Sequence, residues 1–188
     1  SASVNLGVGL PTLVAERIRP DQEIIIHSEN GVLGVSGRPT KETVSPTLIN
    51  AGKETISIKK GASFFDSSLS FGMIRGGHID FCVLGGMEVD AKRGLANWMI
   101  PGKKVTGMGG AMDLVNGAKC VIIMMAHKNK EGVTKLVNEC TLPLTGAQVV
   151  DLVVTELGIF KPNGKSFEIK KLAPGITKEN LGPANLFT

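Results

Sequence analysis

The chain has 188 residues, of which 42% are hydrophobic, and its formal net charge is +4. This size and composition suit one domain with a full hydrophobic core. We expect no membrane and no nucleic acid as partner, because no apolar run is long enough to cross a bilayer, no signal peptide is visible, and the scattered basic residues are not interleaved with aromatics. The modest basic excess suits a small anionic molecule that bears phosphate.

Cysteine and histidine usage argues against a metal site and for a reducing compartment. Cys82, Cys120 and Cys140 are odd in number and far apart, so we expect free thiols in the cytoplasm, with the mitochondrial matrix as the alternative. The three histidines have no metal-ligand spacing around them, and no metal is predicted.

Apolar patterning predicts strands that alternate with helices. In chain order we expect a strand near residues 1–6, a helix at 11–18, a strand at 23–27, a helix at 65–74, a strand at 79–84, a helix at 110–115, a strand at 120–125, a helix at 145–150 and a strand at 152–155. Continuous apolar strands separated by helices indicate an α/β fold with a mainly parallel sheet flanked by helices.

The last part of the chain is more polar and is interrupted by three prolines, Pro162, Pro174 and Pro183. Residues 166–170 within it predict an edge strand or a hairpin arm. We therefore expect residues 1–160 to form the main domain and residues 161–188 to form an extension that packs on it or trails from it. The last dozen residues are expected to be loosely held.

The segment His27-Ser28-Glu29-Asn30-Gly31 places a lone carboxylate directly after an apolar strand. A carboxylate is costly to desolvate there, so Glu29 needs either a buried partner or a chemical role. Ligand sites in parallel sheets gather at the carboxyl ends of strands, which favours a chemical role. An isolated motif of this kind could also simply cap the next turn.

A second segment, Gly107-Met108-Gly109-Gly110, forms a loop whose backbone amides are not covered by bulky side chains. Such amides can stabilise an oxyanion, although a glycine loop alone is more often a turn. A carboxylate nucleophile together with an amide-lined loop is the minimum equipment for acyl transfer through covalent intermediates.

An ordered set of motifs, spread over roughly residues 4–160, resembles the β subunit of family I coenzyme A transferases. This group contains the succinyl-CoA:3-ketoacid and acetate/acetoacetate CoA-transferases. The motifs are Asn5-Leu6-Gly7-Val8-Gly9-Leu10-Pro11, Ser28-Glu29-Asn30-Gly31, Ile49-Asn50-Ala51-Gly52-Lys53-Glu54-Thr55, Gly61-Ala62-Ser63-Phe64-Phe65, Ile74-Arg75-Gly76-Gly77-His78, Leu95-Ala96-Asn97-Trp98-Met99-Ile100-Pro101-Gly102-Lys103, Gly107-Met108-Gly109-Gly110-Ala111-Met112-Asp113-Leu114 and Cys140-Thr141-Leu142-Pro143-Leu144-Thr145-Gly146.

The resemblance implies a fold of the CoA-transferase and ribose-5-phosphate-isomerase type, and it implies roles for particular residues. Glu29 matches the family's nucleophile, and Asn5 and the backbone of Gly110 are implied to lie beside the reacting thioester. Lys53 and Gly109 are implied to contact the coenzyme. Taken alone, Asn5 could instead satisfy backbone groups at a strand end, and Lys53 could be a solvated surface lysine.

The activity implied by the resemblance is transfer of coenzyme A between carboxylic acids by ping-pong chemistry, through a glutamyl-CoA thioester on Glu29. Coenzyme A is then a substrate, and no cofactor is required. The family pattern also implies an α subunit, which supplies the remaining active-site groups in a hetero-oligomer. Two alternatives stay open: an acyl-CoA hydrolase, in which water replaces the acceptor acid, and a non-catalytic domain that binds a small molecule.

The chain departs from the family pattern at three positions. His27 stands where the family usually has Gln, Gly94 where it usually has an acidic residue, and Ala126 where it usually has Glu. None of them removes the nucleophile. We expect the alternation of the strand to point the His27 side chain to the sheet face opposite Glu29.

Overall fold

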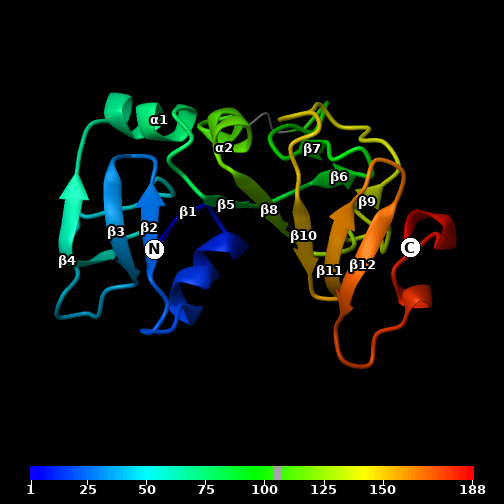
Figure 1. The fold of residues 1–188 in the computed structure, drawn as a ribbon, viewed down its shortest axis with the longest axis horizontal. Coiled ribbons are helices and arrows are strands. Elements are labelled where there is room, and N and C mark those ends of the chain that lie inside the picture. The colour runs from blue at the N-terminus through cyan, green and yellow to red at the C-terminus, as the bar shows by residue number, and fades with distance from the viewer. Residues whose placement is uncertain (104–106) are drawn as a thin grey trace. The chain divides into compact units, whose positions relative to one another are not determined.

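The structure is a computed structural model that describes residues 1–103 and 107–188. It divides into two units, one comprising residues 1–84 and 117–119 and the other comprising residues 85–116 and 120–188 (Figure 1).

Among the described residues of the first unit, five strands form a sheet in the order β5 (Phe81–Leu84), β1 (Ala2–Leu6), β2 (Ile24–Ser28), β3 (Val32–Gly37) and β4 (Ser57–Phe64). β1 pairs in parallel with both β2 and β5, whereas β3 and β4 continue the sheet as antiparallel strands. The strands predicted at residues 23–27 and 79–84 are confirmed.

Helical segments cover both faces of this sheet. On one face Ile26 belongs to a buried cluster with Val32, Val35 and Ile56, and Ala15 of the 3₁₀ helix η1 (Leu10–Arg17) packs against that cluster. On the other face lies α1 (Ser67–Arg75), whose first turn is capped by the Asp66 side chain. Both helices were expected, and Pro11 at the start of η1 suits a first helical turn.

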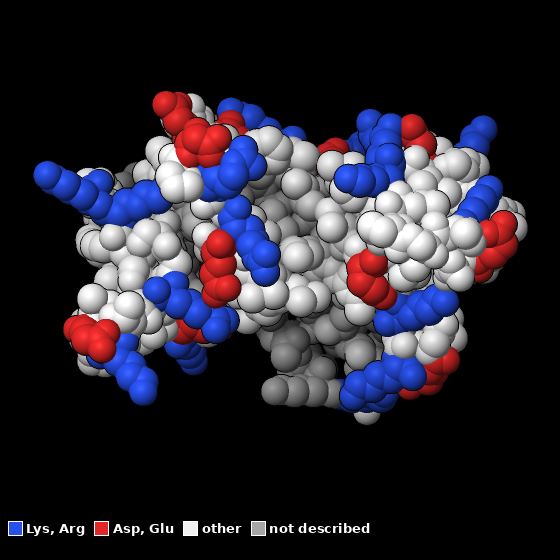
Figure 2. Space-filling view, turned by 90° about the horizontal axis from the view of Figure 1, so that it is seen from below, with Lys and Arg blue, Asp and Glu red and all other residues white. Residues whose placement is uncertain are grey.

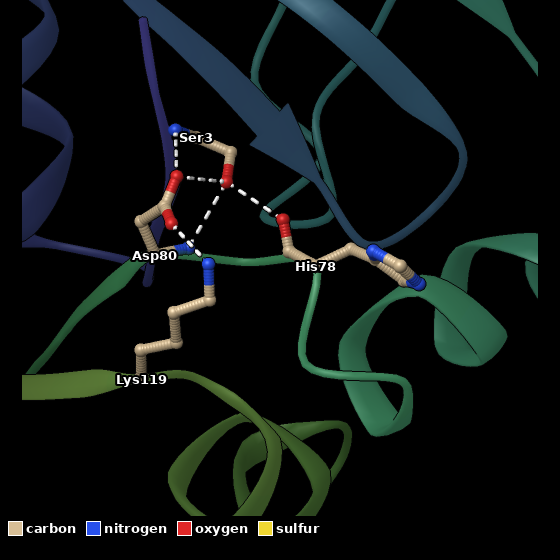
Figure 3. A network of polar contacts seen from close by, with 4 residues as sticks. All are labelled: Ser3, His78, Asp80 and Lys119. Atoms are coloured by element: carbon tan, nitrogen blue, oxygen red, sulfur yellow. Dashed lines mark hydrogen bonds and ion pairs between the residues drawn. The ribbon is translucent and has the colours of Figure 1, made fainter.

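The two parallel neighbours β1 and β5 are joined by a polar network around Asp80, the residue before β5 (Figure 3). The Asp80 carboxylate accepts hydrogen bonds from Ser3 N at 2.8 Å and from Lys119 Nζ at 2.7 Å, and it lies 2.9 Å from Ser3 Oγ. The hydrogen bonds from Lys119 and Ser3 hold the pKa of Asp80 well below its ordinary value of 3.8. The ionised carboxylate therefore stabilises the pairing of β1 with β5.

In the described part of the second unit, four strands form one sheet in the order β8 (Cys120–Met124), β10 (Leu152–Thr155), β11 (Gly158–Pro162) and β12 (Phe167–Leu172). β8 and β10 are parallel, and β11 and β12 add as antiparallel strands. A second sheet contains three short strands, β7 (Leu95–Ala96), β6 (Glu88–Asp90) and β9 (Leu136–Val137). α2 (Ala111–Gly117) corresponds to the helix predicted at residues 110–115.

The predicted α/β fold is confirmed, with parallel pairs in both units and antiparallel strands added beside them. No helix in the part of the chain that the structure describes is long and apolar enough to cross a membrane. On the face shown in Figure 2, Lys and Arg side chains are interspersed with Asp and Glu. This mixture is typical of a solvated surface.

The helix predicted at residues 145–150 is absent, and that prediction was wrong. Gly146 forms an isolated bridge with Leu95, and the backbone N–H groups of Val149 and Val150 both donate to Arg93 O. A segment this short gains little from closing its own helical turn. Hydrogen bonds to distant backbone groups therefore determine its conformation.

Residues 161–188 belong to the second unit, and β12 forms the predicted hairpin arm and edge strand. The expectation that the last dozen residues are loosely held was wrong. Phe187 is fully buried among Phe160 and Phe167, and Thr188 N donates to Phe167 O at 2.9 Å. The prediction relied on the average polarity of the tail, which gives little weight to a single aromatic residue. Burial of the Phe187 ring stabilises the packing of the last residues on the second unit.

The Asp80 network predicts a specific pH dependence of stability. Because the pKa of Asp80 is lower in the folded than in the unfolded chain, its stabilising contribution is complete above about pH 4 and declines as the pH falls below that. Asp80→Asn should therefore lower the melting temperature at pH 7, and its difference from wild type should shrink on acidification. Thermal unfolding followed by circular dichroism between pH 7 and pH 2 measures this difference.

Asp21→Asn is the matched control, because Asp21 pairs with Arg19, two residues away, and its side chain is 70% exposed. Exposed pairs contribute little to stability. A melting-temperature loss at Asp80 that stays constant over the whole pH range would contradict the assignment.

Candidate active site

Glu29 lies in the turn that follows β2, and its side chain is half-buried. Its Oε2 accepts a hydrogen bond from Asn5 Nδ2 at 3.0 Å. The turn is closed by Gly31 N, which donates to Ser28 O at 2.9 Å. Gly31 has a φ of +113°, and a Cβ there would lie 1.9 Å from Phe65 O, so no other residue fits. The backbone of this turn thus fixes the position of Glu29 just beyond the end of β2.

Asn5 is fully buried on β1, directly beside His27 of β2 in the parallel register. Since a carboxylate can only accept, the Asn5 amide nitrogen must be the atom that faces Glu29. The same nitrogen lies 3.0 Å from His27 Nδ1. Asn5 Oδ1 is buried and has no hydrogen-bond partner among the described residues. The amide therefore presents one unused acceptor beside the carboxylate.

His27 shares this amide with Glu29. Because Asn5 Nδ2 is a donor, His27 Nδ1 must accept, so the ring proton sits on Nε2, which lies 3.0 Å from Ser70 Oγ of α1. The ring stacks on Phe65 at a centroid distance of 6.2 Å. Burial lowers the pKa of His27 to about 4, so the imidazole is neutral at pH 7.

The expectation that His27 faces away from Glu29 was wrong. Residues two apart along a strand point to the same face, and Ser28 between them points to the other. Ser28 Oγ accepts from Ala51 N at 3.0 Å, whereas His27 and Glu29 both contact Asn5. Neither Ser70 nor Phe65 was a predicted site residue, because no sequence signal marks a helix residue that meets a buried histidine.

Lys53 lies in an exposed loop that is tethered to the Glu29 turn. Asn30 Nδ2 donates to Ile49 O at 2.8 Å, and Lys53 N donates to Asn50 O at 2.9 Å. Lys53 has a φ of +64°, a conformation that Asn and Gly adopt more readily. The predicted contact of Lys53 with the coenzyme stays a prediction.

Gly109 and Gly110 belong to the second unit, at the start of α2. Gly109 has a φ of +54°, and no heavy atom of the described residues lies within 4 Å of the position that a Cβ would take. Gly110 O accepts from Leu114 N at 3.0 Å, as at the start of a helix. Of the predicted site residues, the structure brings together Glu29 and Asn5, and the roles of Gly109 and Gly110 beside them stay predictions.

Comparisons with known proteins point to one family. Residues 1–181 match the family described as Coenzyme A transferase. The chain is 52% identical to one subunit of the probable succinyl-CoA:3-ketoacid coenzyme A transferase of Bacillus subtilis (strain 168), over 95% of this chain and 83% of the relative. It is 51% identical to the beta subunit of the acetate CoA-transferase of Haemophilus influenzae (strain ATCC 51907 / DSM 11121 / KW20 / Rd), over 95% of this chain and 79% of the relative.

A solved structure shares the fold. The acyl-CoA transferase apoenzyme of Escherichia coli O157:H7 superposes with a TM-score of 0.74 at 20% identity, covering 100% of this chain and 39% of that one. At this identity the likeness concerns the fold alone.

The environment of His27 predicts how substitutions there affect stability. His27→Leu removes the acceptor of Asn5 and the partner of Ser70 in a buried place, and each polar group left without a partner should cost about 1–3 kcal/mol. His27→Gln keeps one acceptor and one donor, so it should retain most of the stability. Urea unfolding of the two variants tests this prediction, and an equal loss in both would contradict it.

Proposed function

Because this chain belongs to the coenzyme A transferase family, we propose that it is the β subunit of an enzyme that moves coenzyme A between carboxylic acids. The observation that carries the proposal is the half-buried Glu29 carboxylate, held by a hydrogen bond from the fully buried Asn5 amide. A carboxylate oriented in this way is suited to nucleophilic attack on a thioester.

The proposed reaction has two symmetrical halves. Glu29 attacks the acyl-CoA carbonyl, which gives a mixed anhydride and releases the coenzyme as a thiolate. The thiolate attacks the glutamyl carbonyl, which gives a glutamyl-CoA thioester and frees the first acid as its carboxylate. The acceptor carboxylate then attacks this thioester, and the released thiolate attacks the acceptor's acyl carbonyl, which restores Glu29. This order is ping-pong, and every bond formed balances one broken.

The chain's own groups assist these steps in different ways. Asn5 Nδ2 can donate to a Glu29 oxygen before attack and to the glutamyl carbonyl oxygen afterwards. We assign the backbone N–H groups of Gly109 and Gly110 to the oxyanions that form, where losing one donor typically costs about 3 kcal/mol of barrier. Lys53 is assigned to the coenzyme. No proton is taken from the nucleophile, which agrees with a neutral, buried His27 that is not needed as a base.

The partner and substrates follow from the relatives' names. Those names describe single subunits of larger enzymes, in one case a beta subunit, which supports a second, α subunit and a hetero-oligomer. They also mention succinyl-CoA, 3-ketoacids and acetate, which supports short-chain acids and 3-oxoacids as the exchanged groups. Among the described residues, Cys82, Cys120 and Cys140 form no disulfide, which suits the cytoplasm or the mitochondrial matrix.

The covalent step predicts a chemical trap. In the enzyme assembled with its α partner, acyl-CoA followed by borohydride should reduce the Glu29 thioester to an alcohol, detectable by peptide mass spectrometry. Glu29→Gln should lower transfer by on the order of 10⁴-fold or more, since the nucleophile is lost. Glu23→Gln is the control, because the Glu23 side chain is 83% exposed. Unmodified Glu29 in an enzyme that is turning over would refute the mechanism.

Dependence on an acceptor acid separates transfer from hydrolysis. We expect the donor acyl-CoA to be consumed only when acetate, acetoacetate or succinate is added, with an equal amount of the acceptor's CoA thioester formed and no free thiol released, because the acceptor carboxylate resolves the glutamyl thioester. Loss of the donor at the same rate without any acid, with release of free coenzyme A thiol, would identify an acyl-CoA hydrolase instead. The measurement is chromatographic separation of the acyl-CoA species together with a free-thiol assay, over a panel of acceptors.

A further inference from the structure

His27 is a buried imidazole to which the proposed reaction gives no chemical task. Its side chain is only 1% exposed, so a substrate in the site does not reach it. Burial lowers the pKa of His27 to about 4, so at pH 7 the ring carries a proton on only one of its two nitrogens. Any contribution of the ring must therefore pass through its contacts, which are Asn5, Ser70 and Phe65.

The Asn5 amide can take two orientations, which differ by a half-turn about its last side-chain bond and exchange Nδ2 with Oδ1. In the observed orientation, Nδ2 lies 3.0 Å from Glu29 Oε2 and 3.0 Å from His27 Nδ1. In the other orientation, Oδ1 would face the Glu29 carboxylate, and two acceptors would repel each other. Only the observed orientation therefore supplies Glu29 with a donor.

The observed orientation has a cost, since it leaves Asn5 Oδ1 buried without a hydrogen-bond partner among the described residues. The half-turned orientation would relieve this cost if His27 carried its proton on Nδ1, because Oδ1 would then accept from it. With the proton on Nε2, His27 Nδ1 can only accept, and this holds Asn5 Nδ2 in place. The tautomer of His27 thus selects the orientation of the amide.

Ser70 supports the required tautomer from α1. Its Oγ lies 3.0 Å from His27 Nε2 and can accept a hydrogen bond from the protonated nitrogen. Ser70 is fully buried, so water does not take its place as the partner of the ring. Phe65 stacks on the same ring with an interplanar angle of 12°. These contacts hold the imidazole with Nδ1 toward Asn5.

The support that Asn5 receives from Glu29 changes during the proposed reaction. A carboxylate accepts a stronger hydrogen bond than a neutral carbonyl does, and Glu29 loses its charge when it is acylated and then carries the coenzyme. Asn5 Nδ2 has a weaker partner on that side just before the glutamyl carbonyl oxygen must take on negative charge. The hydrogen bond to His27 persists, because the neutral ring is buried and forms no bond in the reaction.

We propose that His27 is a positioning residue for the transfer reaction: its Nδ1 keeps the Asn5 amide nitrogen directed at Glu29 while the glutamyl intermediates form and are resolved. Ser70 assists by holding the tautomer of His27. This inference rests on the proposed function, which makes Glu29 the nucleophile. Because His27 contacts Asn5 and not the substrate, its loss should lower kcat and leave KM unchanged.

Kinetics of the enzyme assembled with its α partner test the proposal. His27→Leu should lower kcat by about tenfold or more at an unchanged KM for acyl-CoA. It should also slow the loss of the glutamyl-CoA thioester after an acceptor acid is added, followed by acid quenching and peptide mass spectrometry. His27→Gln should restore most of the lost rate, because its side chain can accept from Asn5 and donate to Ser70. Ser70→Ala should lie between these two variants.

Asp80→Asn is the matched control for a loss of stability in the same unit. Asp80 contacts Ser3 and Lys119 and none of the residues around Glu29, so kcat should stay near wild type wherever the control is folded. All variants are assayed below their melting temperatures. If His27→Leu does not fold, Ser70→Ala takes its place in the kinetic comparison.

Nuclear magnetic resonance gives a readout that does not depend on activity. The chain contains three histidines, and it can be labelled with ¹⁵N-histidine and assembled with an unlabelled α partner. The ring nitrogens of His27, assigned by their absence in His27→Gln, should show the proton on Nε2.

A proton on Nδ1 would overturn the proposal. So would an unchanged kcat in the folded His27→Leu variant or its replacement, or equal losses of kcat in His27→Leu and His27→Gln. Failure of the proposed function has a different signature: the ring proton would still lie on Nε2, but the wild-type enzyme would show no Glu29 adduct and no transfer between acids.

Discussion

The geometry of the candidate site in the first unit depends on the hydrogen bonds of one buried amide, that of Asn5. Asn5 Nδ2 has two hydrogens, and Glu29 Oε2 and His27 Nδ1 take one each at 3.0 Å. The Asn5 donor fixes the tautomer of His27, and His27 Nε2 lies 3.0 Å from Ser70 Oγ, so α1 is connected to the carboxylate through the buried side chains of His27 and Asn5. Because Asn5 is fully buried, its amide cannot turn to water without losing both bonds. The direction of the Glu29 carboxylate is thus set by the packing of β1, β2 and α1 together.

Backbone geometry makes this arrangement possible. The parallel register places Asn5 beside His27. The chain turns at Glu29, and this turn brings the Glu29 side chain back to the amide of Asn5. Gly31 closes that turn against Phe65, whose N donates to Gly31 O at 3.0 Å while its ring stacks on His27. Phe65 thus contacts the site both through its backbone N–H and through its ring. The backbone path at Gly31 and the position of the Phe65 ring on His27 therefore depend on each other.

The sequence predicts those parts of the fold that local patterns determine. Continuous apolar runs located β2, β5, β8 and β10, because buried parallel strands require them. The same reasoning failed at residues 145–150, where bonds to Leu95 and Arg93 outweigh a weak local tendency, and at Phe187, where one buried ring anchors a polar tail. Glu29 and Asn5 could be predicted because family motifs contain them. Ser70 could not, since its role arises only when a helix and a strand distant in sequence meet, and His27 was misplaced because strand alternation was applied with the wrong step.

Lysine side chains of this basic chain occur in two kinds of environment. Lys119 is paired with Asp80 and joins strands, so its charge is used inside the fold. Lys128, Lys130 and Lys135 line a hollow of the second unit, and within the described residues none of them forms an ion pair. The Glu29 network, by contrast, consists of residues of the first unit, and its geometry is set by contacts within that unit.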